Sequence, residues 1–374
     1  MSNLSEAFVA FDTSKLRNAV AIADAGRAGE IRFLGEIDNT AAATAKLVKK
    51  LAAKYERLTF CYEAGPTGYG LYRQISSLGH ECTVAAPSLI PRKPGNRVKT
   101  NRRDALSLVK LLRAGELTAV WVPDRHHEAM RDLTRAREAA VMDLRSKRQQ
   151  VSAFLLRQGL HYPCKNTWSK AHMNWLASQT LEYLEQRLAF EEMMLAVRQA
   201  QERLARLEQS IHAAVPDWSL SKAVTALRAM RGIDLISATT FLAEIGDLSR
   251  FQTLRELMAY LGLVPSEDST GDKTKRGPIT KAGNRRARRM LVECSWSYQH
   301  PPRVGRDKQE KVAAAPSAVR EIAWKAQCRL HRRYRALTRR GKLKTVAITA
   351  VARELAGFIW AVSREITTVC AVGR

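Results

Sequence analysis

The spacing of hydrophobic residues in the first 118 positions limits the fold most strongly, because strand-like and helix-like segments alternate there. The runs AFVAFDTS, NAVAIADA and IRFLGEID are short, apolar and separated by turn-forming residues, which predicts three neighbouring strands. The helical stretch TAAATAKLVKKLAAKY is followed by strands at LTFCYEA and CTVAAP, with a helix at GYGLYRQISSLG between them. A last helix, RDALSLVKLLRAGE, completes a mixed-sheet α/β domain over residues 1–118.

Helical spacing replaces this alternation in residues 119–216. Apolar residues step by three and four along one seam, as in a coiled coil: Phe190, Met193, Val197, Ala200, Leu204, Leu207 and Ile211. An earlier stretch supplies a partner helix: Met130, Leu133, Val141, Leu144, Val151 and Leu155. The segment HYPCKNTWSK predicts a turn between them. The seam is either intramolecular packing or a dimer interface, and we expect a coiled-coil arm that also supports oligomerisation.

The remaining residues, 217–374, predict a mainly α-helical C-terminal domain. Its first segment, MRGIDLISATTFLAEIGDLSRF, is similar to a helix-hairpin-helix unit, in which a Gly-containing turn leads into a helix whose first amides face a phosphate. Such a unit binds the nucleic-acid backbone without reading its sequence. A plain helical hairpin is the alternative.

Positive charge is the most unusual property of the composition. The chain has 62 Lys and Arg against 36 Asp and Glu, a net charge of +26, and such self-repulsion favours a polyanionic partner over a solvated surface or a membrane surface. Residues 1–90 are nearly balanced, whereas the excess lies in residues 87–103 and 273–344. The predicted nucleic-acid contacts are Lys99, Arg102, Arg103, Lys273, Lys275, Arg276, Lys281, Arg285, Arg286, Arg332, Arg333 and Arg335.

Targeting signals and cysteines indicate the compartment. We find no run of about 18 apolar residues that could span a bilayer, and the start MSNLSEAF lacks the features of a signal peptide. We therefore expect a bacterial cytoplasmic protein that acts at the nucleoid and has no membrane partner. The six cysteines are scattered without zinc-ligand spacing, which predicts reduced thiols.

Three acidic residues stand out in the first domain. Asp12 lies inside the apolar run VAFDTSK, Glu63 ends LTFCYE, and Asp104 begins a helix in KTNRRDAL. A carboxylate in a buried strand is unfavourable without a compensating cation, and acids from strands and a following helix can converge at one sheet edge. One or two Mg²⁺ ions held there could stabilise the oxygens of a phosphodiester during cleavage. Alternatively, each acid alone is a strand-end or helix-cap carboxylate.

The segments VAFDTSK, YEAGPTGYG and KTNRRDALSLVKLLRAGEL resemble the three acidic motifs of the DEDD transposases of bacterial insertion sequences. The resemblance implies a ribonuclease H-like domain similar to the RuvC resolvase, and metal ligands at Asp12, Glu63, Asn101 and Asp104. The family has an acid where this chain has Asn101. A neutral oxygen there should lower metal affinity and impair catalysis. Asn101 is either a natural variant or a substitution made to stall catalysis, and we favour the latter.

The resemblance resumes in YLGLVPSEDSTGDKTKRGPITKAGNRRARRMLVECSW. In the family, a serine beside a glycine in this segment is the nucleophile that becomes covalently joined to DNA. Alignment on Gly271 places Thr270 at the serine position and Ser269 one residue earlier, and we favour Ser269 because a primary alkoxide attacks phosphorus more readily than a secondary one. Nearby cations can neutralise phosphate charge. From composition alone, the segment could equally be a turn on a basic surface.

A basic helix is predicted over residues 320–345, with Trp324, His331 and Tyr334 between its arginines. Arginine and aromatic planes can stack on unpaired bases, so single-stranded RNA is an expected partner, and a solvated basic helix is the alternative. The family resemblance implies an RNA-guided recombinase that joins donor and target double-stranded DNA under an element-encoded guide RNA. It further implies a dimer or tetramer in which the acids and the hydroxyl meet in one composite site between subunits.

Two other functions remain open from the sequence. A structure-specific nuclease of the Holliday-junction type would use the acidic site alone and would not need Ser269. A non-catalytic nucleic-acid-binding scaffold would use its acids only as helix caps and would show no divalent-dependent cleavage.

Overall fold

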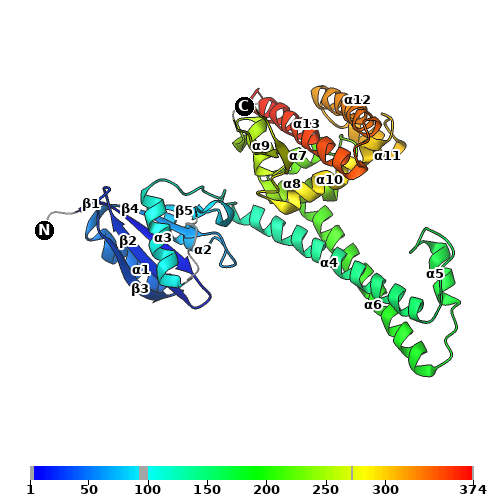
Figure 1. The fold of residues 1–374 in the computed structure, drawn as a ribbon, viewed down its shortest axis with the longest axis horizontal. Coiled ribbons are helices and arrows are strands. Elements are labelled where there is room, and N and C mark those ends of the chain that lie inside the picture. Colours follow the sequence, from blue (N-terminus) through cyan, green and yellow to red (C-terminus); the bar gives the residue numbers. More distant parts are fainter. Residues whose placement is uncertain (1–3, 92–99, 271–272, 373–374) are drawn as a thin grey trace. The chain divides into compact units, whose positions relative to one another are not determined.

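The computed structural model describes residues 4–91, 100–270 and 273–372, and the chain divides into two compact units, Met1–Pro123 and Asp124–Arg374 (Figure 1). The long helices of the predicted arm and the C-terminal helices fall in the same unit. The three-part division at residues 118 and 216 therefore stays a prediction.

The first unit is built on a five-stranded mixed sheet in the order β3-β2-β1-β4-β5. Its elements are β1 (Leu4–Thr13), β2 (Arg17–Asp24), β3 (Ile31–Asp38), α1 (Ala41–Ala52), β4 (Tyr55–Glu63), α2 (Gly70–Ser77), β5 (Glu81–Ala85) and α3 (Asn101–Arg113). The hairpin-linked strands β1 to β3 are antiparallel, and β4 and β5 continue the sheet in parallel with β1. This confirms the predicted element order and a mixed α/β N-terminal domain.

The two faces of this sheet carry different side chains because residues alternate along a strand. Large residues such as Phe11 and Phe60 pack with α1 and α2 on one face. On the other face, alanines and Cys61 leave room for α3, whose buried residues are those predicted: Ala105, Leu108, Val109 and Leu112.

Two long helices begin the second unit and lie side by side (Figure 1). They are α4 (Arg125–Arg157), which is about 50 Å long at 1.5 Å per residue, and α6 (Leu184–Ala214). Short helix α5 (Lys170–Ala177) lies between them in the chain. Predicted seam residues such as Leu144, Phe190 and Val197 share one buried cluster, so this part of the seam packs within the chain. A role in oligomerisation stays a prediction.

The rest of the second unit is a helical domain with one small hairpin. Its helices are α7 (Ser221–Leu227), α8 (Leu235–Ile245), α9 (Leu254–Tyr260), α10 (Arg285–Ser295), α11 (Arg306–Ala313), α12 (Ser317–Arg339) and α13 (Lys344–Val372), and its strands are β6 (Pro265–Glu267) and β7 (Arg276–Ile279). Helix α13 packs against α7, α9, α10 and α12, and supplies much of the core.

Helix α13 corrects one expectation. The stretch Lys344–Ile366 is long and apolar enough to cross a membrane by length and composition, so the prediction that no segment could do so is wrong. The physical reason for its apolarity is visible in the packing, because Ile348, Val351, Leu355 and Ile359 are buried in the core of the unit.

The basic helix expected over residues 320–345 is also revised. Helix α12 ends at Arg339, and Gly341 follows with a φ of 74°, a left-handed conformation that glycine adopts without strain. Tyr334 is buried with Ala323 and Leu330 on the inner face of α12 instead of lying among the arginines, whereas Trp324 is 48% exposed.

Candidate functional site

The strand alternation brings two of the predicted acids to one face of the sheet. Ala10 and Cys61 face α3, while Phe11 and Tyr62 face the opposite side. Asp12 and Glu63, one residue further along β1 and β4, therefore share the α3 face. The two strands are parallel, with Phe11 opposite Tyr62, so both acids lie at the same sheet edge.

Helix α3 brings its N-terminus toward this edge. At its C-terminal end, the Arg113 guanidinium donates to the backbone carbonyls of Asp24 and Gly29, at 3.2 and 2.8 Å. Asp24 is paired with Ala7 near the start of β1, so α3 runs antiparallel to β1 and begins at the Asp12 end. Its first turn contains Asp104.

The resulting acidic corner has oxygen donors of the kind Mg²⁺ prefers. Asp12, Glu63 and Asp104 are half-buried and Asn101 is exposed. Within residues 4–91, 100–270 and 273–372, no group of three or more His, Cys, Asp or Glu side chains is close enough to hold a metal ion. The topology thus brings the predicted ligands to one corner without forming a closed metal site, and the ligand roles stay predictions.

Ser269 and Thr270 lie at the end of the β6–β7 hairpin. Backbone hydrogen bonds join Asp268 to Lys275 at 2.9 Å and Thr270 to Lys273 at 3.2 Å, which extends the hairpin beyond the strands. Both hydroxyl-bearing residues are exposed. Residue 271, the glycine of the predicted motif, lies outside the described residues. An exposed hairpin end can reach a backbone phosphate without rearrangement of the domain core.

Glu267 is a residue that sequence reasoning missed. The Ser269 hydroxyl donates to Glu267 Oε1 at 3.0 Å, and Arg276 Nε lies 3.7 Å from Glu267 Oε2 across the hairpin. A carboxylate in this position can orient the hydroxyl and accept its proton during attack. The spacing of two residues in an extended segment puts both side chains on one face and could have indicated the pair.

The start of α10 is held by a buried network. Asn284 caps the helix by accepting from the amides of Arg286 and Ala287, and its Nδ2 donates to Glu244 Oε2 at 2.8 Å. The guanidinium of Arg135 on α4 donates to both oxygens of Glu244, at 2.8 and 3.1 Å. Burial alone would raise the pKa of Glu244, but these hydrogen bonds lower it below its ordinary value. The network therefore holds the basic N-terminus of α10 in place.

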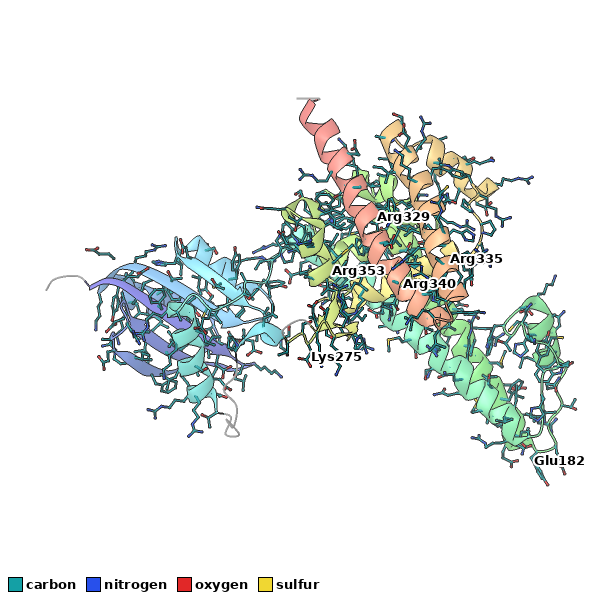
Figure 2. All side chains as sticks on the ribbon, turned by 45° about the horizontal axis from the view of Figure 1, so that its top comes forward. Glu182, Lys275, Arg329, Arg335, Arg340 and Arg353 are labelled. Atoms are coloured by element: carbon teal, nitrogen blue, oxygen red, sulfur yellow. The ribbon has the colours of Figure 1, made fainter. Side chains whose placement is uncertain are left out.

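The predicted nucleic-acid contacts divide into two groups. Three already have acidic partners, with the Nε atoms of Arg276, Arg286 and Arg333 at 3.7, 2.5 and 3.2 Å from Glu267, Glu138 and Glu354. These three are exposed, as are the other predicted contacts that the structure describes: Arg102, Arg103, Lys273, Lys275, Lys281, Arg285, Arg332 and Arg335. Lys99 lies outside the described residues. Figure 2 labels Lys275 on the hairpin and Arg335 on α12.

The predicted helix-hairpin-helix segment, residues 230–251, forms a turn, α8 and a short 3-10 helix at Leu248–Arg250, and α7 ends before it at Leu227. Gly232 in the turn has a φ of 77°, and an added Cβ would lie 2.3 Å from the carbonyl oxygen of Cys294. The α8 amide of Ser237 is bonded by the Asp234 side chain at 2.7 Å, so a phosphate there would have to compete with this cap. Phosphate binding by this turn stays a prediction.

Comparison with known proteins gives two family matches. The model described as "Transposase IS116/IS110/IS902 family" matches residues 224–308, and a model of the IS110-type DEDD transposases matches residues 9–158. The first segment includes Ser269 and Thr270, and the second includes Asp12, Glu63, Asn101 and Asp104.

Full-length relatives agree with these matches. The protein named "Putative transposase y4qE" of Sinorhizobium fredii is 57% identical, over 98% of this chain and 90% of its own length. The "Transposase for insertion sequence element IS1533" of Leptospira borgpetersenii is 31% identical over 78% of this chain and 85% of its own.

Proposed function

Because this chain belongs to the IS116/IS110/IS902 family of insertion-sequence transposases, we propose that it cuts and rejoins DNA through a covalent bond between DNA and Ser269. The observation that carries the proposal is the exposed Ser269 hydroxyl bonded to the Glu267 carboxylate on a basic hairpin. Thr270, the next residue, is the alternative nucleophile.

The chemistry of this step follows from the hairpin residues. Ser269 Oγ attacks a backbone phosphorus as its proton passes to Glu267, to which it is already hydrogen-bonded. The new Oγ–P bond replaces the bond to one deoxyribose oxygen, which leaves and takes a proton from solvent. Lys273 and Lys275 are exposed, and their backbones pair across the hairpin with Thr270 and Asp268, so their side chains can neutralise charge on the phosphoryl oxygens. The phosphoserine bond conserves the phosphodiester, so the strand can be rejoined without ATP.

We propose that the acidic corner assists this same cleavage step. The family of DEDD transposases suggests dependence on divalent metal in general. We propose that Asp12, Glu63 and Asp104 hold one or two Mg²⁺ ions with Asn101 as a weak fourth ligand, and that bound Mg²⁺ would stabilise negative charge at the phosphodiester. Asn101 provides one neutral oxygen where an acid would provide a charge, so we expect this site to bind metal less tightly than one with four acids.

We further propose that a guide RNA and an assembly of two or four subunits complete the enzyme. Exposed Trp324 with neighbouring basic residues on α12 provides a surface on which unpaired RNA bases can stack. Figure 2 also labels Arg340 at the end of this helix and Arg353 on α13. Donor and target DNA duplexes are the substrates in this proposal.

The test is a reaction with end-labelled DNA, resolved on a denaturing gel. We expect a protein–DNA adduct that Ser269→Ala removes and Thr270→Ala retains. If only Thr270→Ala removes the adduct, Thr270 is the nucleophile. If the wild type and both variants cleave DNA without forming an adduct, a purely metal-dependent nuclease replaces the serine mechanism. If no DNA is cleaved, even by Asn101→Asp, a non-catalytic binding scaffold is favoured.

A further inference from the structure

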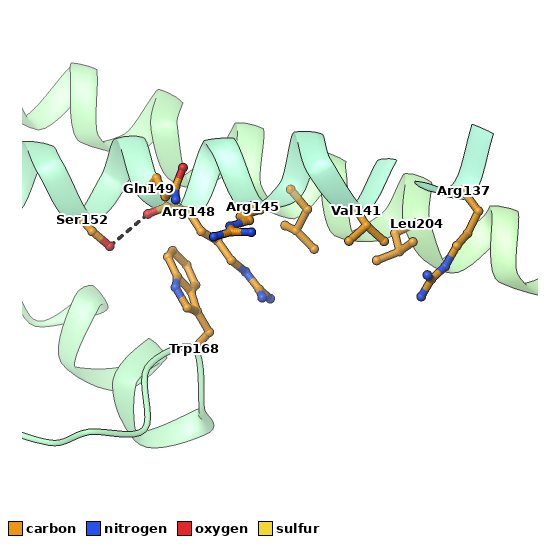
Figure 3. A pocket seen from close by; sticks show the side chains of 9 residues that line it. Arg137, Val141, Arg145, Arg148, Gln149, Ser152, Trp168 and Leu204 are labelled. Carbon is orange, nitrogen blue, oxygen red and sulfur yellow. Dashed lines mark hydrogen bonds between the residues drawn. The ribbon is translucent and has the colours of Figure 1, made fainter. Parts of the chain in front are cut away.

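A shallow cavity of about 430 Å³ lies on the arm, against α4, α6 and the loop that precedes α5 (Figure 3). Its lining on α4 includes Arg137, Arg145 and Arg148, and the loop contributes Trp168. The volume is within the range of sites that hold a small molecule or one unit of a polymer. The family motifs discussed above do not account for it.

The lining is cationic. Three of the nine lining residues, all from the described part of the chain, are arginines, and none is acidic. Arg137 is ion-paired with Glu208 at 2.6 Å, whereas Arg145 is exposed. Arg145 and Arg148 are three residues apart and therefore neighbours on the helix surface. The two together can neutralise a phosphate diester.

Arg148 and Trp168 form a stacking surface at the same place. The Arg148 guanidinium carbon lies 5.0 Å from the centre of the Trp168 ring, and Figure 3 shows the indole directed toward α4. Among the described residues, the Nε of Arg148 is buried without a hydrogen-bond partner.

The backbone at Trp168 is strained to hold this orientation. Its φ of 62° lies in the left-handed region, which is unfavourable for a bulky L-residue. The backbone N–H of Trp168 donates to His172 Nδ1 at 2.9 Å, and the two rings meet edge to face at 5.4 Å. Buried His172 thus fixes the strained residue, a feature that is often associated with binding sites.

We propose that this cavity binds one unpaired nucleotide of a nucleic-acid strand, with the base against Trp168 and Arg148 and the phosphate at Arg145. Aromatic and guanidinium planes stack on any base, and the arginines supply the charge for the backbone. This proposal rests on the proposed function only in that a recombinase exposes unpaired strands. The strand is either RNA or single-stranded DNA, since both have the same base and phosphate chemistry.

The experiment uses the full-length protein and 12-nucleotide strands, one of RNA and one of DNA, containing 5-iodouracil. After irradiation, we expect a crosslinked peptide containing Trp168. Arg145→Gln with Arg148→Gln should weaken binding of the preferred strand by about tenfold and reduce the salt slope by about 0.7, as expected for loss of the one phosphate contact at Arg145. The strand that shows this loss identifies the source. Arg198→Gln, which removes an exposed charge from α6, is the control and should change affinity by less than about twofold.

One further variant, measured for both binding and melting temperature, separates loss of binding from loss of folding. Arg148→Lys keeps the charge and removes the planar group, so we expect binding between the wild type and Arg148→Gln with an unchanged melting temperature. The inference would be overturned if crosslinks formed only on other peptides and the Arg145 and Arg148 variants bound as tightly as Arg198→Gln. That result would leave DNA adducts at Ser269 intact. If the wild type forms no adduct at Ser269 but still binds the strand at Trp168, only the proposed function is refuted.

Discussion

Glu244→Ala should destabilise the helical unit far more than loss of an ordinary surface ion pair. The Glu244 side chain is 2% exposed and accepts hydrogen bonds from Arg135 and Asn284. Hydrogen bonds to a charged group contribute about 1.5–3 kcal/mol to stability. We take the lower end for the pair with Arg135, whose side chain is 41% exposed and can be resolvated. Adding about 1.5 kcal/mol for the Asn284 bond, which is also made to the charged carboxylate, gives a loss of about 3 kcal/mol.

Urea unfolding followed by circular dichroism measures this loss directly, with a drop in melting temperature of about 5–10 °C expected in parallel. Glu321→Ala is the matched control, because Glu321 is exposed and lies 3.5 Å from Lys325 one turn away, a pair worth only about 0.5 kcal/mol. Asn284 also caps α10, so duplex DNA binding should weaken in Glu244→Ala and not in Glu321→Ala. Equal unfolding midpoints for the two variants would refute the assigned role of the network.

Other predictions follow from the same contacts. Glu267→Gln should slow adduct formation on the order of a hundredfold, as expected for loss of a general base, whereas exposed neighbour Asp268→Asn should not; equal rates would remove Glu267 from the mechanism. Asn101→Asp should increase Mg²⁺-dependent cleavage with DNA affinity nearly unchanged, and equal activity would mean that residue 101 is not a ligand. The pKa of Glu244 is lowered in the folded state, so the ionised carboxylate stabilises the fold fully above its ordinary pKa of 4.5, and this stabilisation is lost as the pH falls through the folded pKa. Melting temperatures measured at decreasing pH should show this loss in the wild type and not in Glu244→Gln. RNA should co-purify at moderate salt, and a preparation with the absorbance ratio of pure protein would contradict the guide-RNA proposal.

Local patterns were sufficient for much of the fold. Alternation along β1 and β4 gave the strands and the unusual positions of Asp12 and Glu63, and the one-sided spacing of Leu108 and Leu112 gave the buried face of α3. These features depend only on neighbours within a few residues, so they can be predicted from the sequence alone.

Contacts between distant segments could not be predicted in this way. The pair of Arg286 and Glu138 joins residues 148 positions apart and depends on how α4 and α10 pack. The left-handed conformation of Trp168 has no glycine or asparagine to signal it. Tyr334 is different, because it continues the stripe of Val319, Ala323, Ala326 and Leu330, so helical spacing already indicated burial.

The most direct test of the account is mass spectrometry of the protein–DNA adduct after digestion with trypsin and nuclease. The serine mechanism predicts a nucleotide phosphate attached to Ser269, on the tryptic peptide that ends at Lys273, and no such modified peptide from Ser269→Ala. A modified residue elsewhere in the chain, or recombination products with no modified peptide at any time point, would contradict it.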